Sequence, residues 1–143
     1  MTKRRQAPAE TGETTAEDLD LAASLRQAVE AAADRKAEEV KILDLAGLTD
    51  LTDYFVICSA GNQRQVQAIS DGIEERLRQQ GVRPLHIEGY PSARWVLMDY
   101  GDFVVHVFQE EQRRFYALEK LWLGAEDVTA DVTSRGEEAG GAP

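Results

Sequence analysis

The segment that decides the fold is Asp53-Tyr54-Phe55-Val56-Ile57-Cys58-Ser59-Ala60. It is nearly all apolar and rich in residue types that favour β-structure, so it predicts a central strand buried on both faces of a sheet. Gly61-Asn62 interrupts the strand, and the Asn62 side chain can cap a following helix. That helix is predicted because apolar residues then recur at three- and four-residue steps, at Val66, Ile69, Ile73 and Leu77. Gly81 is a plausible helix stop.

The sequence before this segment predicts one helix and one strand. An amphipathic helix is expected over residues 17–35, with a capping-box start at Thr14 or Thr15. A short strand follows over residues 40–45 and ends at Gly47.

The sequence after it predicts three more strands and a last helix. Pro84 suits the start of a strand over residues 85–87. Strands over residues 95–98 and 103–108 should pair as a hairpin, because Asp99-Tyr100-Gly101-Asp102 between them has turn chemistry. A C-terminal helix ended by Gly124 is expected from Phe115, Leu118, Leu121 and Trp122. The order αββαβββα predicts a single α/β domain with a mixed five-stranded sheet and flanking helices.

Length and composition limit the classes of protein that the chain can belong to. With 143 residues, of which 43% are hydrophobic and 29% charged, one soluble domain is expected. We expect a domain at residues 16–124 between two disordered tails, one at residues 1–15 and an acidic one at residues 125–143. Both tails lack the apolar area that offsets ordering entropy. The net charge of −10 argues against binding to a nucleic-acid phosphate backbone and favours a basic partner, so no direct sequence-specific nucleic-acid partner is predicted.

Cysteine and histidine are too scarce for several kinds of site. One cysteine excludes a disulfide framework and a multi-cysteine zinc site, and two histidines make an imidazole-rich metal site improbable, so no metal and no cofactor is predicted. No apolar stretch approaches the roughly 20 residues of a membrane span. No apolar region follows the basic Lys3-Arg4-Arg5, so a secretory signal is not expected, and we predict a cytoplasmic protein.

Several residues admit both a chemical and a structural role. Ser59-Ala60-Gly61-Asn62 before a helix could hold an anion, although such turns are common in α/β proteins. Asp99 and Asp102 could form a carboxylate pair, but Asp in a hairpin turn more often bonds to local backbone. His106 lies in an apolar strand, where a buried histidine satisfied by a polar neighbour is favoured over a catalytic base. Cys58 is expected to be an inert core thiol.

Aromatic and charged residues are dense between Glu88 and Trp122, and the segments around them resemble a known family. They are Asp50–Ile57, Glu88-Gly89-Tyr90, Arg94–Asp102 and Arg114–Trp122, in order within about residues 18–124. Together these motifs resemble the ribosomal silencing factor family RsfS, also called Iojap. The resemblance implies a nucleotidyltransferase-like fold without catalytic residues. It also implies a non-enzymatic translational repressor that binds the large ribosomal subunit through ribosomal protein L fourteen and sterically prevents subunit joining under nutrient limitation.

Two alternatives to the repressor are kept. Relatives in organelles serve assembly of the large subunit, so an assembly factor is one. A nucleotidyltransferase-like enzyme is the other, and it is disfavoured because active enzymes carry two carboxylates one residue apart on a strand, where they can share magnesium. Here the strand offers Asp53-Tyr54-Phe55, and no Gly-Ser turn precedes it.

The hairpin of residues 94–109 with the adjoining helix is the predicted docking surface. Trp95, Asp99, Tyr100 and Asp102 are the candidate partner-binding residues, because carboxylates beside an aromatic ring can bind Lys or Arg. Truncation of Tyr100 should then weaken binding by roughly 1–3 kcal/mol without unfolding the domain. Trp95 could instead be mainly core. A homodimer away from the ribosome is left open.

Overall fold

The computed structural model describes residues 16–134 of the 143. In chain order the elements are α1 (Ala16–Asp34), β1 (Glu38–Asp44), β2 (Tyr54–Ala60), α2 (Gln63–Arg78), β3 (His86–Glu88), β4 (Trp95–Asp99), β5 (Phe103–Gln109), α3 (Glu110–Tyr116), α4 (Leu118–Leu121) and β6 (Glu126–Asp127). A further helical turn begins at Thr129. The predicted fold class, a mixed α/β domain with flanking helices, is confirmed.

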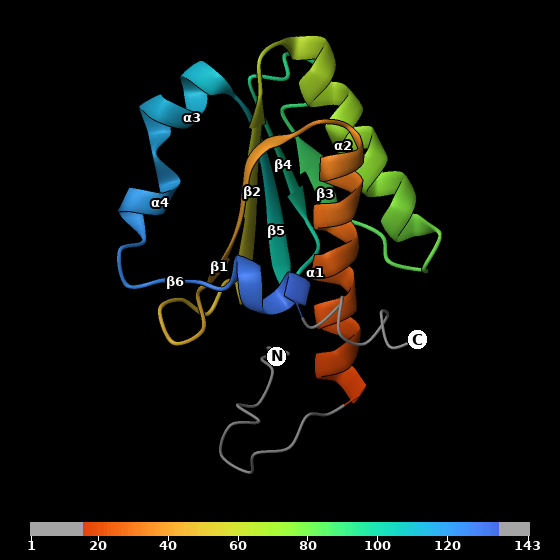
Figure 1. Cartoon of the computed structure of the whole chain (residues 1–143), viewed down its shortest axis with the longest axis vertical. Helices are drawn as coiled ribbons and strands as arrows, with labels where there is room; N and C mark the ends of the chain where they lie inside the picture. Colours follow the sequence, from red (N-terminus) through yellow and green to blue (C-terminus); the bar gives the residue numbers. More distant parts are fainter. Residues whose placement is uncertain (1–15, 135–143) are drawn as a thin grey trace.

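The strands form one sheet in the order β3-β4-β5-β2-β1-β6 (Figure 1). The central pair, β2 and β5, is parallel, and the other four neighbouring pairs are antiparallel. The predicted hairpin is therefore confirmed as β4–β5. The sheet has six strands rather than the predicted five, because β6 pairs with the outer edge of β1.

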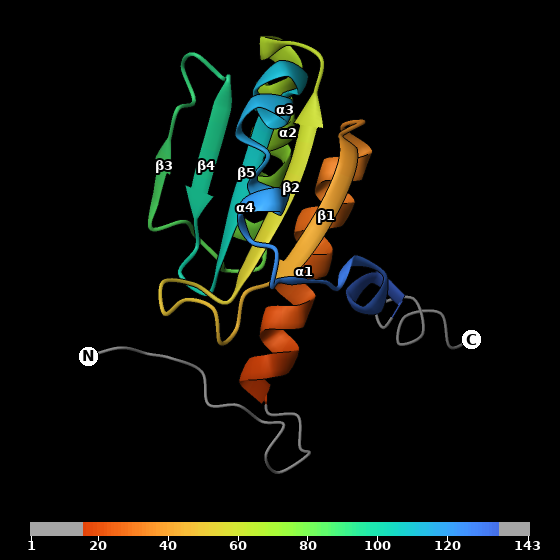
Figure 2. The ribbon, with the colours of Figure 1, turned by 90° about the vertical axis from the view of Figure 1, so that its left-hand side faces the viewer.

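Helices lie on both faces of the sheet, but they cover the two faces unequally. The long helices α1 and α2 pack side by side on one face, and the short helices α3 and α4 lie over the other (Figures 1 and 2). Figure 2 shows α3 and α4 in front of β5 and β2, which leaves β3 and β4 uncovered. We call the side with α3 and α4 the open face.

Side chains of β2 alternate between these two layers. Val56, Cys58 and Ala60 belong to the core under α1 and α2, whereas Ile57 and Phe55 belong to a smaller cluster on the open face. Both faces of the strand are thus covered by protein, which confirms the central strand predicted from its continuous apolar run. The Cys58 thiol is fully buried, and desolvation raises its pKa to about 12, as expected of an inert core cysteine.

Local chemistry explains the turns that were predicted. The Asn62 side chain accepts a hydrogen bond from the Gln65 main-chain N–H at 2.8 Å and so caps α2. At the hairpin turn, Asp99 Oδ1 accepts from the Gly101 N–H at 2.8 Å, and Gly101 has a φ of 90°, which glycine adopts without strain. Asp99 therefore has the local turn role that was favoured over a metal-binding pair.

The predicted C-terminal helix is wrong in its continuity. The chain forms two short helices, α3 and α4, because Ala117 between them adopts a left-handed conformation with φ 46° and ψ 54°. The break rotates the two helical faces relative to each other, so the apolar residues do not share one buried face. Leu118 is buried, but Phe115 is 78% exposed and Leu121 is 71% exposed.

The predicted acidic tail is wrong for the first part of residues 125–143. Glu126 and Asp127 form β6 against β1, and the main-chain N–H of Ile42 donates to Thr129 Oγ1 at 2.7 Å. Val132 is buried against the main core. These contacts satisfy the edge of β1 and offset the ordering entropy of the segment. The predictions for residues 1–15 and 135–143, and the capping box at Thr14 or Thr15, lie outside the described residues.

Among residues 16–134, no helix combines the length and the apolar character needed to cross a lipid bilayer.

Candidate functional site

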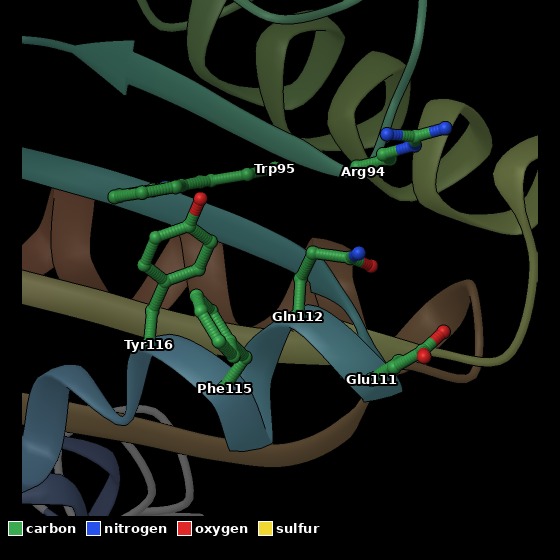
Figure 3. Close-up of a pocket in the computed structure, with 6 residues that line it drawn as sticks. All are labelled: Arg94, Trp95, Glu111, Gln112, Phe115 and Tyr116. Atoms are coloured by element: carbon green, nitrogen blue, oxygen red, sulfur yellow. The ribbon is translucent and has the colours of Figure 1, made fainter.

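The open face carries an aromatic groove between the start of β4 and α3. It has a volume of about 330 Å³ and is lined by Arg94, Trp95, Glu111, Gln112, Phe115 and Tyr116 (Figure 3). The Trp95 and Tyr116 rings lie 4.6 Å apart between centroids, and Phe115 meets Tyr116 edge to face at 5.0 Å. An exposed cluster of aromatic rings of this kind is typical of a surface that binds another macromolecule.

A second depression, which we call the sheet hollow, lies further along the same face. It has a volume of about 320 Å³. Side chains from the β1–β2 loop, the four strands β2 to β5 and the segment after α4 line it: Thr49, Leu51, Thr52, Phe55, His86, Glu88, Leu97, Asp99, Val104, His106 and Trp122. The floor is mainly apolar, with carboxylates on the β3–β4 side.

Trp95 and His106 connect the two depressions. The Trp95 indole N–H donates to His106 Nδ1 at 3.0 Å, so the prediction of a buried histidine bonded to a polar neighbour is confirmed for this one ring nitrogen. His106 is 3% exposed, and desolvation lowers its pKa to about 3, so the imidazole is neutral at physiological pH. Because Nδ1 accepts a hydrogen bond, the single ring proton resides on Nε2.

The carboxylates of the sheet hollow are arranged around His86 on β3. His86 Nε2 lies 3.1 Å from Glu88 Oε2, and His86 Nδ1 lies 3.9 Å from Asp99 Oδ2. The Glu88 side chain is 66% exposed and that of Asp99 is 29% exposed. This side of the hollow therefore presents negative charge to a partner.

Arg113 holds α3 and α4 against the sheet. Its side chain is 6% exposed, and the guanidinium donates to Glu119 Oε2 from Nη2 at 2.6 Å and from Nε at 2.9 Å. Nη1 donates to the main-chain oxygen of Glu39 at 2.7 Å and to Ser59 Oγ at 3.3 Å. One side chain thus joins α3 to α4, β1 and β2, which fixes the position of the exposed aromatic residues.

The four predicted partner-binding residues do not form one surface. Trp95 and Asp99 lie on the open face, in the groove and in the hollow respectively. Asp102 is exposed in the hairpin turn, where its main-chain oxygen accepts from the N–H groups of Asp53 and Tyr54. Tyr100 lies on the opposite side of the sheet.

Tyr100 packs against the helix-covered core. Its ring stacks on Phe103 with centroids 4.9 Å apart and planes 12° apart, and its buried hydroxyl has no hydrogen-bond partner among residues 16–134. Desolvation, with a smaller contribution from the negative charge of Glu74 on α2, raises the pKa of Tyr100 well above its ordinary value. These contacts favour a structural role for Tyr100 over a role in docking.

Sequence reasoning missed much of the open face. The C-terminal helix was included in the predicted docking surface, but Phe115 was expected only as one of its apolar residues, and Tyr116 and Arg113 were counted only among the aromatic and charged residues of that region. The role of Arg113 could not be predicted from local sequence, because its partners Glu39 and Ser59 are 74 and 54 residues away along the chain. Among residues 16–134, no group of three or more His, Cys, Asp or Glu side chains could hold a metal ion.

The fold and these depressions define a class of protein: a small α/β domain whose prominent surface feature is an aromatic, acid-flanked face suited to binding a macromolecule. Comparison with known proteins identifies the family. Residues 18–142 match the family model described as "Ribosomal silencing factor during starvation". The chain therefore belongs to the ribosomal silencing factor family, as its motifs suggested.

Relatives and solved structures agree with this assignment. The chain is 45% identical over 104 residues to the ribosomal silencing factor RsfS of Halalkalibacterium halodurans, covering 73% of this chain and 89% of that protein. It is 32% identical over 121 residues to the chloroplastic protein Iojap of Zea mays, covering 85% of this chain and 51% of that one. A crystal structure of a Chromobacterium violaceum protein superposes with a TM-score of 0.68 at 35% identity, covering 70% of this chain and 83% of the other.

Proposed function

We propose that this protein binds the large ribosomal subunit through ribosomal protein L fourteen and, by its bulk, prevents the small subunit from joining. Membership of the ribosomal silencing factor family supports a ribosomal partner. The mechanism requires no bond to be made or broken: a folded domain fixed on the intersubunit side of one subunit occupies the space that the other needs. Such occlusion represses translation, and we propose that it acts in the cytoplasm and under nutrient limitation, the condition that the description of the matching family names as starvation.

The main support for the location of the docking site is the exposed apolar surface of α3, α4 and the segment after them. Phe115, Leu121 and Leu123 are 78%, 71% and 83% exposed, and the aromatic groove adjoins Phe115. Large apolar side chains exposed together mark an interaction surface, because they gain free energy when a partner removes them from water. The buried ion pair of Arg113 with Glu119 holds α3 and α4 in place before binding. Less conformational entropy is therefore lost when a partner binds this surface.

Charge favours a basic partner at this face. The chain carries a net charge of −10, and Glu88 and Asp99 lie on the side of the sheet hollow. Acidic groups beside an apolar surface steer a basic protein to it and fix its register. Of the residues predicted from sequence, Trp95, Asp99 and Asp102 remain candidate contacts in this proposal.

Sedimentation tests the partner and light scattering tests the consequence. The protein should co-sediment with purified large subunits and not with small ones, and binding should weaken as salt rises because exposed charges contribute. It should also lower the light scattering of mixed subunits under conditions in which they associate. Equal binding to both subunits, or none to either, would contradict the proposal.

A pair of substitutions locates the interface. Phe115→Ala should weaken large-subunit binding by roughly 1–3 kcal/mol, the range of an aromatic hot spot, with little loss of stability because the ring is exposed in the free protein. Leu85→Ala is the matched control, because Leu85 is 72% exposed but precedes β3, away from α3. Unchanged binding by the Phe115 variant would place the interface elsewhere.

A further inference from the structure

The His106 ring has one nitrogen that the described structure leaves unused. Nδ1 accepts from Trp95, but Nε2, which carries the ring proton, is buried and has no hydrogen-bond partner. A buried N–H without an acceptor costs free energy, so a fold that retains one leaves a group able to gain from an acceptor supplied by another molecule. His106 lines the sheet hollow, which is where such an acceptor would enter.

Strand register places His106 and an acidic side chain in one row across the hollow. Glu88 on β3 is opposite Leu97 on β4, and Leu97 is opposite His106 on β5. Two strand spacings separate Glu88 from His106, or about 10 Å. The half-buried Leu97 lies between them and gives the row an apolar middle. In the next row on the same face, His86 is opposite Asp99, which adds a second carboxylate.

A hydrogen-bond donor, an apolar strip and two carboxylates follow one another across the hollow, and this order matches a residue with a long cationic side chain. Lys and Arg have a main-chain carbonyl at one end, a hydrocarbon stem in the middle and a cationic head, and the stem packs on apolar surface while the head reaches a carboxylate. An anionic segment would be repelled by Glu88 and Asp99, and an apolar one would add no positive charge to that of the neighbouring His86 when it is protonated. The net charge of −10 on the chain favours the basic occupant at longer range as well.

We propose that the sheet hollow binds a Lys or Arg residue of a basic protein segment: a main-chain carbonyl of the segment accepts from His106 Nε2, the stem lies over Leu97, and the head reaches Glu88 and Asp99 beside the His86 imidazole, which lies 3.1 Å from Glu88 and 3.9 Å from Asp99. The identity of the partner as a ribosomal protein rests on the function proposed above. His106 then acts as a specificity-determining donor, and Trp95 acts as a positioning residue that holds the proton on Nε2.

Entry of the carbonyl requires a small rearrangement of the hollow. Phe55 packs edge to face on the imidazole with centroids 4.4 Å apart, and on its other side it meets Trp122 at 5.9 Å. Both Phe55 and Trp122 are half-buried, so neither is locked in the core. A rotamer change of Phe55 is the kind of side-chain movement that commonly accompanies binding while the backbone stays in place.

A capped amino acid tests the hollow without a ribosome. N-acetyl-lysine N-methylamide should shift the ¹⁵N resonance of His106 Nε2 and the indole signal of Trp95, with a Kd of about 1 mM for a ligand of this size. The norleucine analogue, which lacks the charge, should bind more weakly, and the glutamate analogue should not bind. No shift at His106 with the lysine compound, or equal shifts with all three, would overturn the proposal.

Variants test the same contacts on the large subunit. His106→Phe removes the donor and should lower affinity about threefold to tenfold, the effect of one hydrogen bond. His106→Gln, which can present an N–H near the position of Nε2, should recover part of that loss. Glu88→Lys should lower affinity more than tenfold by replacing attraction with repulsion. Asp131→Lys is the control, because it makes the same charge change in the helical turn beyond β6, at the opposite edge of the sheet.

The two experiments distinguish failure of the further proposal from failure of the proposed function. If the wild-type protein does not bind large subunits, the proposed function fails, and the capped amino acids still decide whether the hollow binds lysine. If the wild-type protein binds and both His106→Phe and Glu88→Lys, shown to be folded by thermal melting, bind equally well, the hollow is not part of the interface and the further proposal is wrong.

Discussion

Replacing Arg113 with Met should destabilise the domain by about 3–5 kcal/mol, the usual cost of breaking a buried ion pair. Met keeps much of the hydrocarbon stem, so the change removes mainly the guanidinium and its hydrogen bonds. Four bonds are lost: two to Glu119, one to the main-chain oxygen of Glu39 and one to Ser59 Oγ. Ser59 Oγ keeps its bond to the Glu38 main-chain oxygen at 3.3 Å, but the Glu39 oxygen loses its Arg113 partner, and the Arg113 side chain is only 6% exposed.

Glu119→Gln should cost less, about 1 kcal/mol, because the amide oxygen can still accept from Arg113 and the side chain is 25% exposed. Urea unfolding followed by circular dichroism measures both variants and the double variant. The two single losses should not add, since both changes act on the same Arg113–Glu119 interaction. A loss below about 1 kcal/mol for Arg113→Met would show that Arg113 does not hold α3 and α4 in place.

The same pair gives stability a dependence on pH. Desolvation raises the pKa of Glu119, but a hydrogen bond from its own N–H and the bonds and charge of Arg113 outweigh this, so its pKa lies below the ordinary 4.5. Since the pKa is lower in the folded state, the stabilisation is present above pH 4.5 and is lost as the pH falls through the folded-state value. Glu119→Gln should remove this part of the acid sensitivity, and an unchanged acid profile would contradict the assignment.

Three further outcomes are expected. Tyr100→Phe should leave the free energy of unfolding unchanged or raise it by about 1 kcal/mol, because it removes a buried hydroxyl that has no partner among the described residues. Tyr100→Ala should lower the free energy of unfolding by about 3–5 kcal/mol, because it also removes the ring that stacks on Phe103. Equal effects of the two changes would place the ring outside the core. The Cys58 thiol, with its pKa of about 12, should react with a thiol reagent at neutral pH only after unfolding, so fast labelling of the native protein would refute its burial. His106, with its pKa of about 3, should show constant imidazole NMR shifts from pH 5 to 8. Because its pKa is lower in the folded state than the ordinary 6.5, the free energy of unfolding should be unaffected by this group above pH 6.5 and should fall as the pH drops from 6.5 toward 3.

Local sequence patterns predicted the elements whose causes are themselves local. The apolar run at residues 54–60 gave β2, the Asn62 side chain capped α2, and the turn chemistry at Asp99 and Gly101 closed the hairpin. Each of these depends on residues within a few positions of one another. The family resemblance added the class of protein, which no single motif would have provided.

Long-range contacts explain what the sequence did not predict. Nothing at Ala117 marks a left-handed residue, since it is neither Gly nor Asn, and the break is accompanied by the pairing of Arg113 with Glu119 across it. β6 is only two residues long and acidic, and it is held by pairing with β1. Tyr100 could have been placed correctly: it follows Val96 and Met98 at steps of two, and both face the helix-covered core.

The central parallel pair also has a consequence for the order in which the domain folds. β1–β2 and β4–β5 are each local antiparallel pairs, which can form within microseconds, but β2 and β5 must meet across a separation of 49 residues, as Tyr54 and Phe103 do. Closing that loop costs entropy before its contacts are made, so it should limit the folding rate. Replacing Val56 or Val105, which pair between β2 and β5, with a smaller residue should therefore slow refolding more than an equally destabilising change at the outer edges of the sheet.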